Sequence, residues 1–406
     1  MPQGDSAVSG NDPARPASGP LSGLRVVDLT QFILGPVATQ ILGDYGADVI
    51  KIENPAGDLN RKIGPARYPD MAAMFLGMNR SKRSVVLNLK RREALDALNR
   101  MIDDADVFVH SMRPQTAERL GVGYAAVAAR NPRIVYACAP GYRQDGPFRD
   151  RPAYDDVIQG ESGIAGITEL AFGEPRYLPI VIADKFCGHI LASSIGMALV
   201  HRERTGEGQE VQVPMLETMM SFNLIEHLWT GAFDEPMGEL GYDRALTPFR
   251  RPFATKDGHI CLMATSDAQS RDLFAACGRP ELGEDPRYAT LAERSKRFPE
   301  LYQLVGEEMA KRTTAEWQAR LDAANVPNGV ARKLRDMPTD PYLVETGFFH
   351  HYAHPQAGPM ITPSIPVQFS KTPARIQSPP PTLGEHTHAV LSAMGYSDQD
   401  IERMSR

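Results

Sequence analysis

Short apolar runs alternate with amphipathic stretches in the first part of the chain. Residues 24–29 and 48–52 are rich in aliphatic and β-branched side chains and predict two strands. Between them, residues 37–43 predict a helix that follows the turn-forming pair Gly35 and Pro36. Strand, helix and strand in this order are typical of a βαβ unit, so the pattern predicts an α/β fold with a parallel sheet.

The same rhythm continues toward residue 140. Further strands are predicted at residues 84–89, 107–110 and 134–139, with an amphipathic helix at 91–105 that carries Leu95, Leu98 and Ile102 on one face. We therefore predict one large α/β domain that extends to about residue 220. In such a domain, ligands bind beyond the carboxyl ends of the strands.

A different pattern begins after Ser221. Residues 251–265 predict a β-rich stretch with a turn at 256–259, and helices are expected at 267–277, 297–312 and 314–324. Residues 346–406 have few periodic apolar positions before 389–394, so we expect this tail to pack back on the first domain. The predicted organisation is a disordered polar leader (1–20), a large domain (21–224 with 346–406) and a small domain (225–345).

Composition and charge exclude several classes of protein. The chain has 406 residues and a formal net charge of −6, which does not fit non-specific nucleic-acid binding. Its four cysteines, Cys138, Cys187, Cys261 and Cys277, are far apart and predict neither a disulfide framework nor a zinc site. No apolar run approaches the ~18 residues that a membrane span requires. We expect a cytoplasmic protein with no membrane or nucleic-acid partner.

Asp184 is the first candidate for chemistry. It stands between an apolar run at residues 178–183, which predicts a strand, and a helical stretch at 186–204. One interpretation is a helix N-cap, because an aspartate there accepts a bond from a free backbone N–H. The other is a carboxylate nucleophile at the end of a sheet, with backbone donors that lower its pKa and stabilise an oxyanion. The two roles are compatible.

Two cationic segments are candidates for binding an anion. Arg80, Lys82 and Arg83 precede a predicted strand and form either a solvated loop or a clamp for phosphate groups. Arg113 and Arg119 follow the strand that ends at residue 110, where an α/β sheet commonly meets its ligand, although an ordinary turn into a helix would look the same.

Other motifs point away from common enzyme classes. The glycines at 160, 163 and 166 lack the strand, helix and distal acid of a dinucleotide site, and the chain has no GxxxxGK[ST], GxSxG or HExxH motif. His350, His351 and His354 have no acid or cysteine at ligand spacing, so we expect an exposed loop there and no metal site.

A set of short segments, taken together and in order, resembles the CaiB/BaiF (class III) family of CoA-transferases. The set comprises Leu21-Ser-Gly-Leu-Arg-Val-Val-Asp28, Gly35-Pro36, Leu42-Gly-Asp-Tyr-Gly-Ala-Asp-Val-Ile-Lys51, Asn79-Arg-Ser-Lys-Arg-Ser84, Gly141-Tyr142, Asp145-Gly-Pro147, Tyr154-Asp155, Arg204-Thr-Gly-Glu-Gly-Gln209 and Leu383-Gly-Glu-His-Thr387. Each segment alone is degenerate, but the ordered set is specific and covers residues from about 20 to 395.

The resemblance implies a Rossmann-like large domain built from both ends of the chain, a smaller middle domain, and an interlocked homodimer. It also implies an acyl-CoA:carboxylate CoA-transferase in which Asp184 attacks the thioester. The enzyme would pass through an aspartyl anhydride and an aspartyl-CoA thioester. Acyl-CoA and an acceptor acid are the implied substrates, with succinyl-CoA or another short or dicarboxylic donor, and no tightly bound cofactor or metal is implied.

The resemblance also assigns the CoA contacts. Asn79, Lys82 and Arg83 would touch the adenosine and phosphate end of CoA, Met112, Arg113 and Arg119 would line its path, and Tyr142 would lie near the thioester. The chain departs from the family pattern at Ser111-Met112-Arg113-Pro114-Gln115, where many members have Asn-Phe/Tyr-x-Pro-Gly. Ile33 stands where formyl-CoA transferase has an active-site Gln, which disfavours formyl-CoA:oxalate transfer.

Two alternatives remain. A 2-methylacyl-CoA racemase would need a His where this chain has Tyr154, and a tyrosine is a weak base at neutral pH. A CoA-binding homologue without turnover would keep Asp184 only for a structural role. Arg250 and Arg251 are either a surface pair or a site for the second carboxylate of a dicarboxylic substrate.

Overall fold

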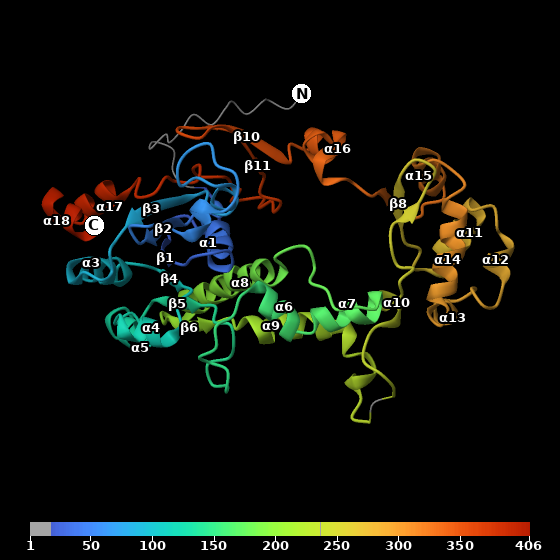
Figure 1. Ribbon diagram of the computed structural model, residues 1–406, viewed down its shortest axis with the longest axis horizontal. Helices are drawn as coiled ribbons and strands as arrows, with labels where there is room; N and C mark the ends of the chain where they lie inside the picture. The colour runs from blue at the N-terminus through green and yellow to red at the C-terminus, as the bar shows by residue number, and fades with distance from the viewer. Residues whose placement is uncertain (1–17, 236) are drawn as a thin grey trace. The chain divides into compact units, whose positions relative to one another are not determined.

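The computed structural model describes residues 18–235 and 237–406, which form two compact units (Figure 1). The larger unit contains the described residues up to Ser162 together with Leu178–Met220 and Pro341–Arg406. The smaller unit contains Gly163–Tyr177 and Ser221–Asp340. The segment 163–177 thus lies in the smaller unit, outside the middle range 225–345 that the sequence suggested. Residues 1–17 of the predicted leader lie outside the described residues.

A six-stranded parallel sheet forms the centre of the larger unit. Its strand order is β3-β2-β1-β4-β5-β6. The strands are β1 (Arg25–Leu29), β2 (Asp48–Glu53), β3 (Lys82–Val86), β4 (Val107–His110), β5 (Val135–Cys138) and β6 (Gln209–Gln212). The chain moves outward in one direction from β1 to β3 and in the other from β4 to β6. The order therefore reverses between β1 and β4, the position at which open α/β sheets bind ligands.

Helices cover the sheet because alternate strand residues point to opposite faces. The helices of this unit are α1 (Leu34–Asp44), α2 (Ala73–Leu76), α3 (Arg92–Asp103), α4 (Pro114–Arg119), α5 (Tyr124–Arg130), α6 (Asp155–Glu161), α8 (Ile182–Thr205), α16 (Pro341–Glu345), α17 (Thr387–Ala393) and α18 (Asp398–Ser405). Val27, Ile50 and Phe108 share one buried cluster with residues of α3, α5, α17 and α18. The predicted elements of the first 140 residues are confirmed, with ends shifted by up to three residues.

The C-terminal tail packs on the larger unit. Val86 in β3 donates its backbone N–H to Thr387 Oγ1 at 2.9 Å, and Asn88 donates to the Met404 carbonyl at 2.7 Å. The tail also holds a hairpin, β10 (Phe349–His354) with β11 (Gly358–Pro363), that the sequence pattern did not predict. The expected exposed histidine loop is therefore wrong: His354 is buried, and its Nε2 contacts the Pro380 carbonyl at 2.8 Å.

The smaller unit is built on the antiparallel sheet β7-β8-β9, with strands Phe253–Ala254, His259–Leu262 and Asn328–Val330. Its helices are α7 (Ile164–Phe172), α10 (Asp243–Leu246), α11 (Asp267–Ala276), α12 (Glu281–Glu284), α13 (Leu291–Ser295), α14 (Phe298–Met309) and α15 (Thr314–Ala323), while α9 (Met215–His227) joins it to the larger unit. Trp317 is buried in its core and donates its indole N–H to the Met309 carbonyl at 2.8 Å. Three helices predicted for this region, at 267–277, 297–312 and 314–324, are confirmed as α11, α14 and α15.

Among the described residues, no helix is long and apolar enough to cross a membrane. The same part of the chain holds no group of three or more His, Cys, Asp or Glu side chains placed to bind a metal ion.

Close packing of α8 against α1 fixes the position of α8 in the larger unit. The contact depends on Gly188, because a Cβ at this position would lie 2.7 Å from the Leu34 carbonyl oxygen of α1. Gly196, two turns further along α8, has no atom within 4 Å of the same added carbon. In α8, close packing therefore requires glycine at position 188 but not at position 196.

We predict opposite effects when each of these glycines is replaced by alanine. Gly188→Ala forces α1 and α8 apart and lowers the free energy of unfolding by about 1–3 kcal/mol. Gly196→Ala raises it by up to about 1 kcal/mol, because alanine loses less backbone entropy on forming a helix. Urea denaturation of the two variants beside the parent measures both changes. Equal effects at the two positions would contradict the packing argument.

Candidate active site

Asp184 lies in the first turn of α8, three residues beyond the N-cap, which is Val181. The predicted strand at 178–183 is wrong, because these residues join no sheet. Their backbone is held by a side chain instead: Leu178 donates its N–H to Gln159 Oε1 at 2.9 Å, and the Ile180 carbonyl accepts from Gln159 Nε2 at 3.2 Å. The N-cap interpretation of Asp184 is also wrong, because α8 begins earlier than the sequence pattern suggested.

A second carboxylate lies beside Asp184. Asp155, the buried first residue of α6, accepts the backbone N–H of Asp184 through Oδ1 at 3.1 Å. Its other oxygen accepts from Gln159 Nε2 at 2.6 Å. The starts of α6 and α8 are therefore held together by one acidic side chain, and two carboxylates share the same small region.

This environment raises the pKa of Asp184 to about 7, first through burial and then through the negative charge of Asp155. The expectation that backbone donors would lower this pKa is therefore wrong. A carboxylate with a raised pKa is a better base and nucleophile once it is ionised, and perturbed groups of this kind concentrate at functional sites.

Cys187 lies one turn further along α8 but does not compete as a nucleophile. Burial, Asp184 and Asp155 together raise the pKa of its thiol to about 12. The thiol therefore stays protonated at neutral pH, and the thiolate is the reactive form of cysteine. Of these two side chains, Asp184 is therefore the candidate nucleophile, because it can ionise near neutral pH.

A cavity of about 390 Å³ opens at the carboxyl ends of β1 to β4, where the strand order reverses. Its lining comes from the residues that follow each strand: Leu29, Gln31, Phe32, Ile52, Glu53, Asn54, Leu87, Asn88, Leu89, Lys90, Ser111, Met112 and Leu120. We refer to it as the switch-point pocket. Met112 was expected at a ligand site and lines it, whereas Asn54, Asn88 and Lys90 were not anticipated. The signal that could have found them is their position directly after a predicted strand.

Phe32 connects the switch-point pocket with the acidic pair. Its ring lines the pocket and meets the ring of Tyr154 edge-on, with centroids 5.5 Å apart. Tyr154 directly precedes Asp155. The backbone of Phe32 has a φ of 64°, a conformation unfavourable for a bulky residue, and its carbonyl accepts a hydrogen bond from Asn60. Strained backbone of this kind is often retained next to functional sites.

Two of the expected CoA contacts lie in the interior of the larger unit. Lys82 is 1% exposed, and its Nζ donates to the Pro36 carbonyl and to Asn79 Oδ1, each at 2.9 Å, with Asp28 Oδ2 at 3.4 Å. Burial lowers the pKa of Lys82 to about 8, although Asp28 opposes the shift. Asn79 also donates to the Phe75 carbonyl at 3.0 Å. Neither residue lines the switch-point pocket.

The other sequence-predicted residues occupy three different settings. Arg83 forms an ion pair with Asp48 at the protein surface and does not line the pocket. Arg113 and Arg119 are exposed at the two ends of α4, and among the described residues neither forms an ion pair. Tyr142 is buried and donates its hydroxyl to Glu161 at 2.8 Å; burial and Glu161 raise its pKa. The structure thus brings Met112 to the pocket, with Arg113 as its direct neighbour.

The family model described as CoA-transferase family III matches residues 21–387, and the chain belongs to this family. It is 34% identical to the probable fatty acyl-CoA transferase Rv3272 of Mycobacterium tuberculosis over 387 residues, which is 92% of this chain and 98% of that protein. It is 31% identical to a succinate–glutarate CoA-transferase of Agrobacterium fabrum, over 95% of this chain and 97% of that one.

Solved structures agree with this assignment. The orthorhombic crystal form of Rv3272 superposes with a TM-score of 0.78 at 33% identity and covers 92% of this chain and 99% of its own. A CAIB/BAIF family protein from Brucella suis gives a TM-score of 0.77 at 29% identity, over 93% and 100% of the two chains. The resemblance seen in the short sequence motifs is therefore confirmed, and the protein is an enzyme of this family.

We predict that Lys82 and Arg83, although adjacent, respond differently to loss of charge. Lys82→Met leaves Asp28 buried without its lysine partner and lowers the free energy of unfolding by about 3–5 kcal/mol. Arg83→Gln removes a half-exposed ion pair and costs at most about 1 kcal/mol. Thermal and urea unfolding of the two variants measure the difference. If Lys82→Met unfolded like the parent and only raised KM for the acyl-CoA, Lys82 would be a CoA contact after all.

Proposed function

We propose that this protein transfers CoA from an acyl-CoA to a carboxylic acid, with Asp184 as the nucleophile. The observation that carries the proposal is the pair of neighbouring carboxylates at two helix starts, one of which has its pKa raised to about 7. A ring contact links this pair to a pocket at the ligand-binding edge of the sheet. Relatives named as transferases of CoA between acids support the same reaction.

The proposed reaction has four steps. Ionised Asp184 attacks the thioester carbonyl of the donor; the C–S bond breaks, and an acyl-aspartyl anhydride and CoA thiolate result. The thiolate then attacks the aspartyl carbonyl, releasing the donor acid and leaving an aspartyl-CoA thioester. An acceptor carboxylate displaces the thiolate to form a second anhydride. Finally the thiolate attacks the acceptor carbonyl, which gives the new acyl-CoA and regenerates Asp184.

Asp155 contributes to this reaction through its charge. Ionised Asp184 is destabilised by burial and by its negative neighbour. Acylation removes the charge of Asp184 and with it this repulsion, so the covalent intermediate is favoured relative to the free carboxylate. Asp155 also holds the Asp184 backbone N–H at 3.1 Å, which orients the first turn of α8. We propose Asp155 as a positioning residue that also raises the reactivity of the nucleophile.

The switch-point pocket is the proposed site for the nucleotide end of CoA. Its volume of about 390 Å³ falls within the range of small-molecule sites. Lys90 on its lining is exposed, and Arg113 and Arg119 lie next to lining residues, so these cations are placed to pair with phosphate groups. Tyr142 near the thioester, and Asn79, Lys82 and Arg83 at the phosphate end, stay predictions of the family resemblance.

For the substrate, we propose a short or dicarboxylic acyl-CoA donor such as succinyl-CoA. Relatives from mouse and Agrobacterium fabrum carry the names of succinyl-CoA:glutarate and succinate–glutarate transferases, and they are 30% and 31% identical to this chain. Arg250 and Arg251 of the smaller unit are both exposed and are the candidates for a second carboxylate. A formyl-CoA:oxalate transferase of Streptomyces avermitilis is also 31% identical, but Ile33 disfavours that activity here.

No observation favours the racemase alternative. Tyr154, which replaces the histidine that a racemase would need, is 60% exposed, and phenols as a class are weak bases at neutral pH. A homologue without turnover is disfavoured by the raised pKa of Asp184, because a purely structural carboxylate gains nothing from a repelling neighbour.

We further propose an interlocked homodimer in the cytoplasm. The support is a pair of exposed apolar side chains on α8: Met197 is 72% exposed and Val200 is 48% exposed. A second chain would remove such side chains from water.

The first test of the proposal is the loss of Asp184. Asp184→Ala should lower kcat for CoA transfer by at least about a thousandfold, because the covalent route is closed. Succinyl-CoA and a panel of free acids, resolved by mass spectrometry, report activity, and hydroxylamine trapping of the parent should mark Asp184 in the peptide map. Lys185→Gln, the exposed neighbouring change, should leave the rate unaltered. Transfer at the parent rate in Asp184→Ala would end the proposal.

The second test uses pH. Asp184 attacks when ionised, so kcat/KM of the parent should rise with pH through a midpoint near 7, the value to which burial and Asp155 raise its pKa. Asp155→Asn keeps an acceptor for the Asp184 N–H but removes the repelling charge, so the midpoint should move down by about one pH unit. Asp156→Asn, an exposed change on the same helix, should not move it. A midpoint near pH 4 in the parent would contradict the electrostatic argument.

A further inference from the structure

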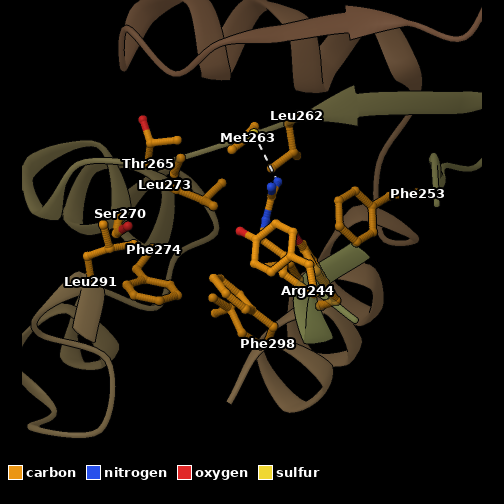
Figure 2. A pocket seen from close by; sticks show the side chains of 15 residues that line it. Arg244, Phe253, Leu262, Met263, Thr265, Ser270, Leu273, Phe274, Leu291 and Phe298 are labelled. Carbon is orange, nitrogen blue, oxygen red and sulfur yellow. Dashed lines mark hydrogen bonds between the residues drawn. The ribbon is translucent and has the colours of Figure 1, made fainter. Parts of the chain in front are cut away.

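A second cavity lies within the smaller unit, separate from every residue that the transfer reaction uses. Its volume is about 190 Å³, and its walls come from α10, β7, β8, α11, α13 and α14 (Figure 2). Most of the lining is aliphatic or aromatic: Phe253, Leu262, Met263, Ala264, Leu273, Phe274, Leu291, Phe298, Leu301 and Val305. The polar lining residues are Tyr242, Arg244, Thr265, Ser270 and Tyr302. We refer to it as the small-unit pocket.

Arg244 is the charged side chain of this lining, and its surroundings are unusual for an arginine. Its Nε donates to the Tyr302 hydroxyl at 2.8 Å, and Nη2 lies 3.0 Å from the Met263 sulfur. The Phe298 ring centroid is 5.7 Å from the guanidinium carbon. Among the described residues, no carboxylate forms an ion pair with Arg244. A fixed positive charge is therefore held among phenol, thioether and ring carbons.

Two other arginines of the same unit have acidic partners among the described residues, unlike Arg244. Arg294 is 1% exposed and pairs with Asp267 at 2.8 Å. Arg297 pairs with Glu293 at 3.1 Å. Arg244 is half-buried. An arginine that lines an apolar cavity without an acidic partner can form a charge-assisted, forked pair of hydrogen bonds with a ligand that brings its own carboxylate.

We propose that the small-unit pocket binds a monocarboxylic acid with a compact apolar body, such as an arylacetic or short aliphatic acid. The carboxylate pairs with Arg244, and the apolar body lies among the leucine and phenylalanine side chains. Apolar cavities of about 150 Å³ accept one benzene ring, so the observed volume suits a single ring or a chain of about six carbons. Dicarboxylic acids are disfavoured, since the apolar wall would leave their second charge unpaired.

This site goes beyond the proposed transfer reaction, and its test requires neither CoA nor turnover. Phenylacetate and phenylacetamide are titrated into the full-length protein by calorimetry, because the two probes differ in charge and hardly in shape. The parent should bind phenylacetate at least tenfold more tightly than phenylacetamide. Arg244→Met should lose that preference, and Arg271→Gln, an exposed arginine on α11 outside the lining, should retain it.

Two further measurements guard against loss of folding. Arg244→Lys keeps the charge and should retain most of the preference for phenylacetate even if Arg244→Met unfolds. In the parent, phenylacetate should shift the methyl resonance of Met263, which lines the pocket. Equal binding of both probes by the parent, or an unchanged preference in a folded Arg244→Met protein, overturns the proposal. Since CoA is absent throughout, these results leave the role of Asp184 untouched.

Discussion

The hydrogen bond from the Asp184 backbone to the Asp155 carboxylate is the contact on which the geometry of the candidate active site depends. It joins the first turns of α6 and α8, although twenty residues of chain separate the end of α6 from the start of α8. The same bond brings two negative charges close together, and in the proposed mechanism this electrostatic cost favours acylation of Asp184. When a neighbouring negative charge destabilises the ionised form of a carboxylate, its reaction with an electrophile is favoured, because acylation removes the charge.

The rest of the larger unit keeps this contact in place. Gly188 allows α8 to pack closely on α1, and Gln159 holds the irregular segment before α8. Beneath the sheet edge, Asp28 accepts hydrogen bonds from Thr30 and Thr39 and lies close to Lys82. Burial alone would raise the pKa of Asp28, but Lys82 and the neighbouring Lys51 lower it overall, so the acid stays ionised and the cluster stays paired. Such a cluster stiffens the strand ends that form the switch-point pocket.

The sequence predicts the parts of this structure in which local pattern and tertiary position agree. Strands β4 and β5 are buried along their whole length, so their continuous apolar runs are easy to recognise, whereas the polar and partly exposed β6 has no such run and was not predicted. The run at 178–183 is also apolar but has no neighbouring strand. Its backbone is hydrogen-bonded by the side chain of Gln159 instead, and a periodic sequence pattern cannot show such a contact. The hairpin at 349–363 was missed because its polar histidines and prolines hide an alternation that only pairing between the two strands makes visible.

Cations were the hardest residues to assign from sequence, and the structure explains why. Charge alone does not separate Lys82, which is neutralised internally by Asp28, from Lys90, which lies exposed on a pocket. What separates them is whether a protein carboxylate already compensates the charge, and this is a property of the fold. By that criterion Arg113 and Arg119 at the larger unit's pocket and Arg244 in the smaller unit belong together, since none has an acidic partner among the described residues. A positive charge that the chain leaves uncompensated beside a cavity is one that a ligand can complete.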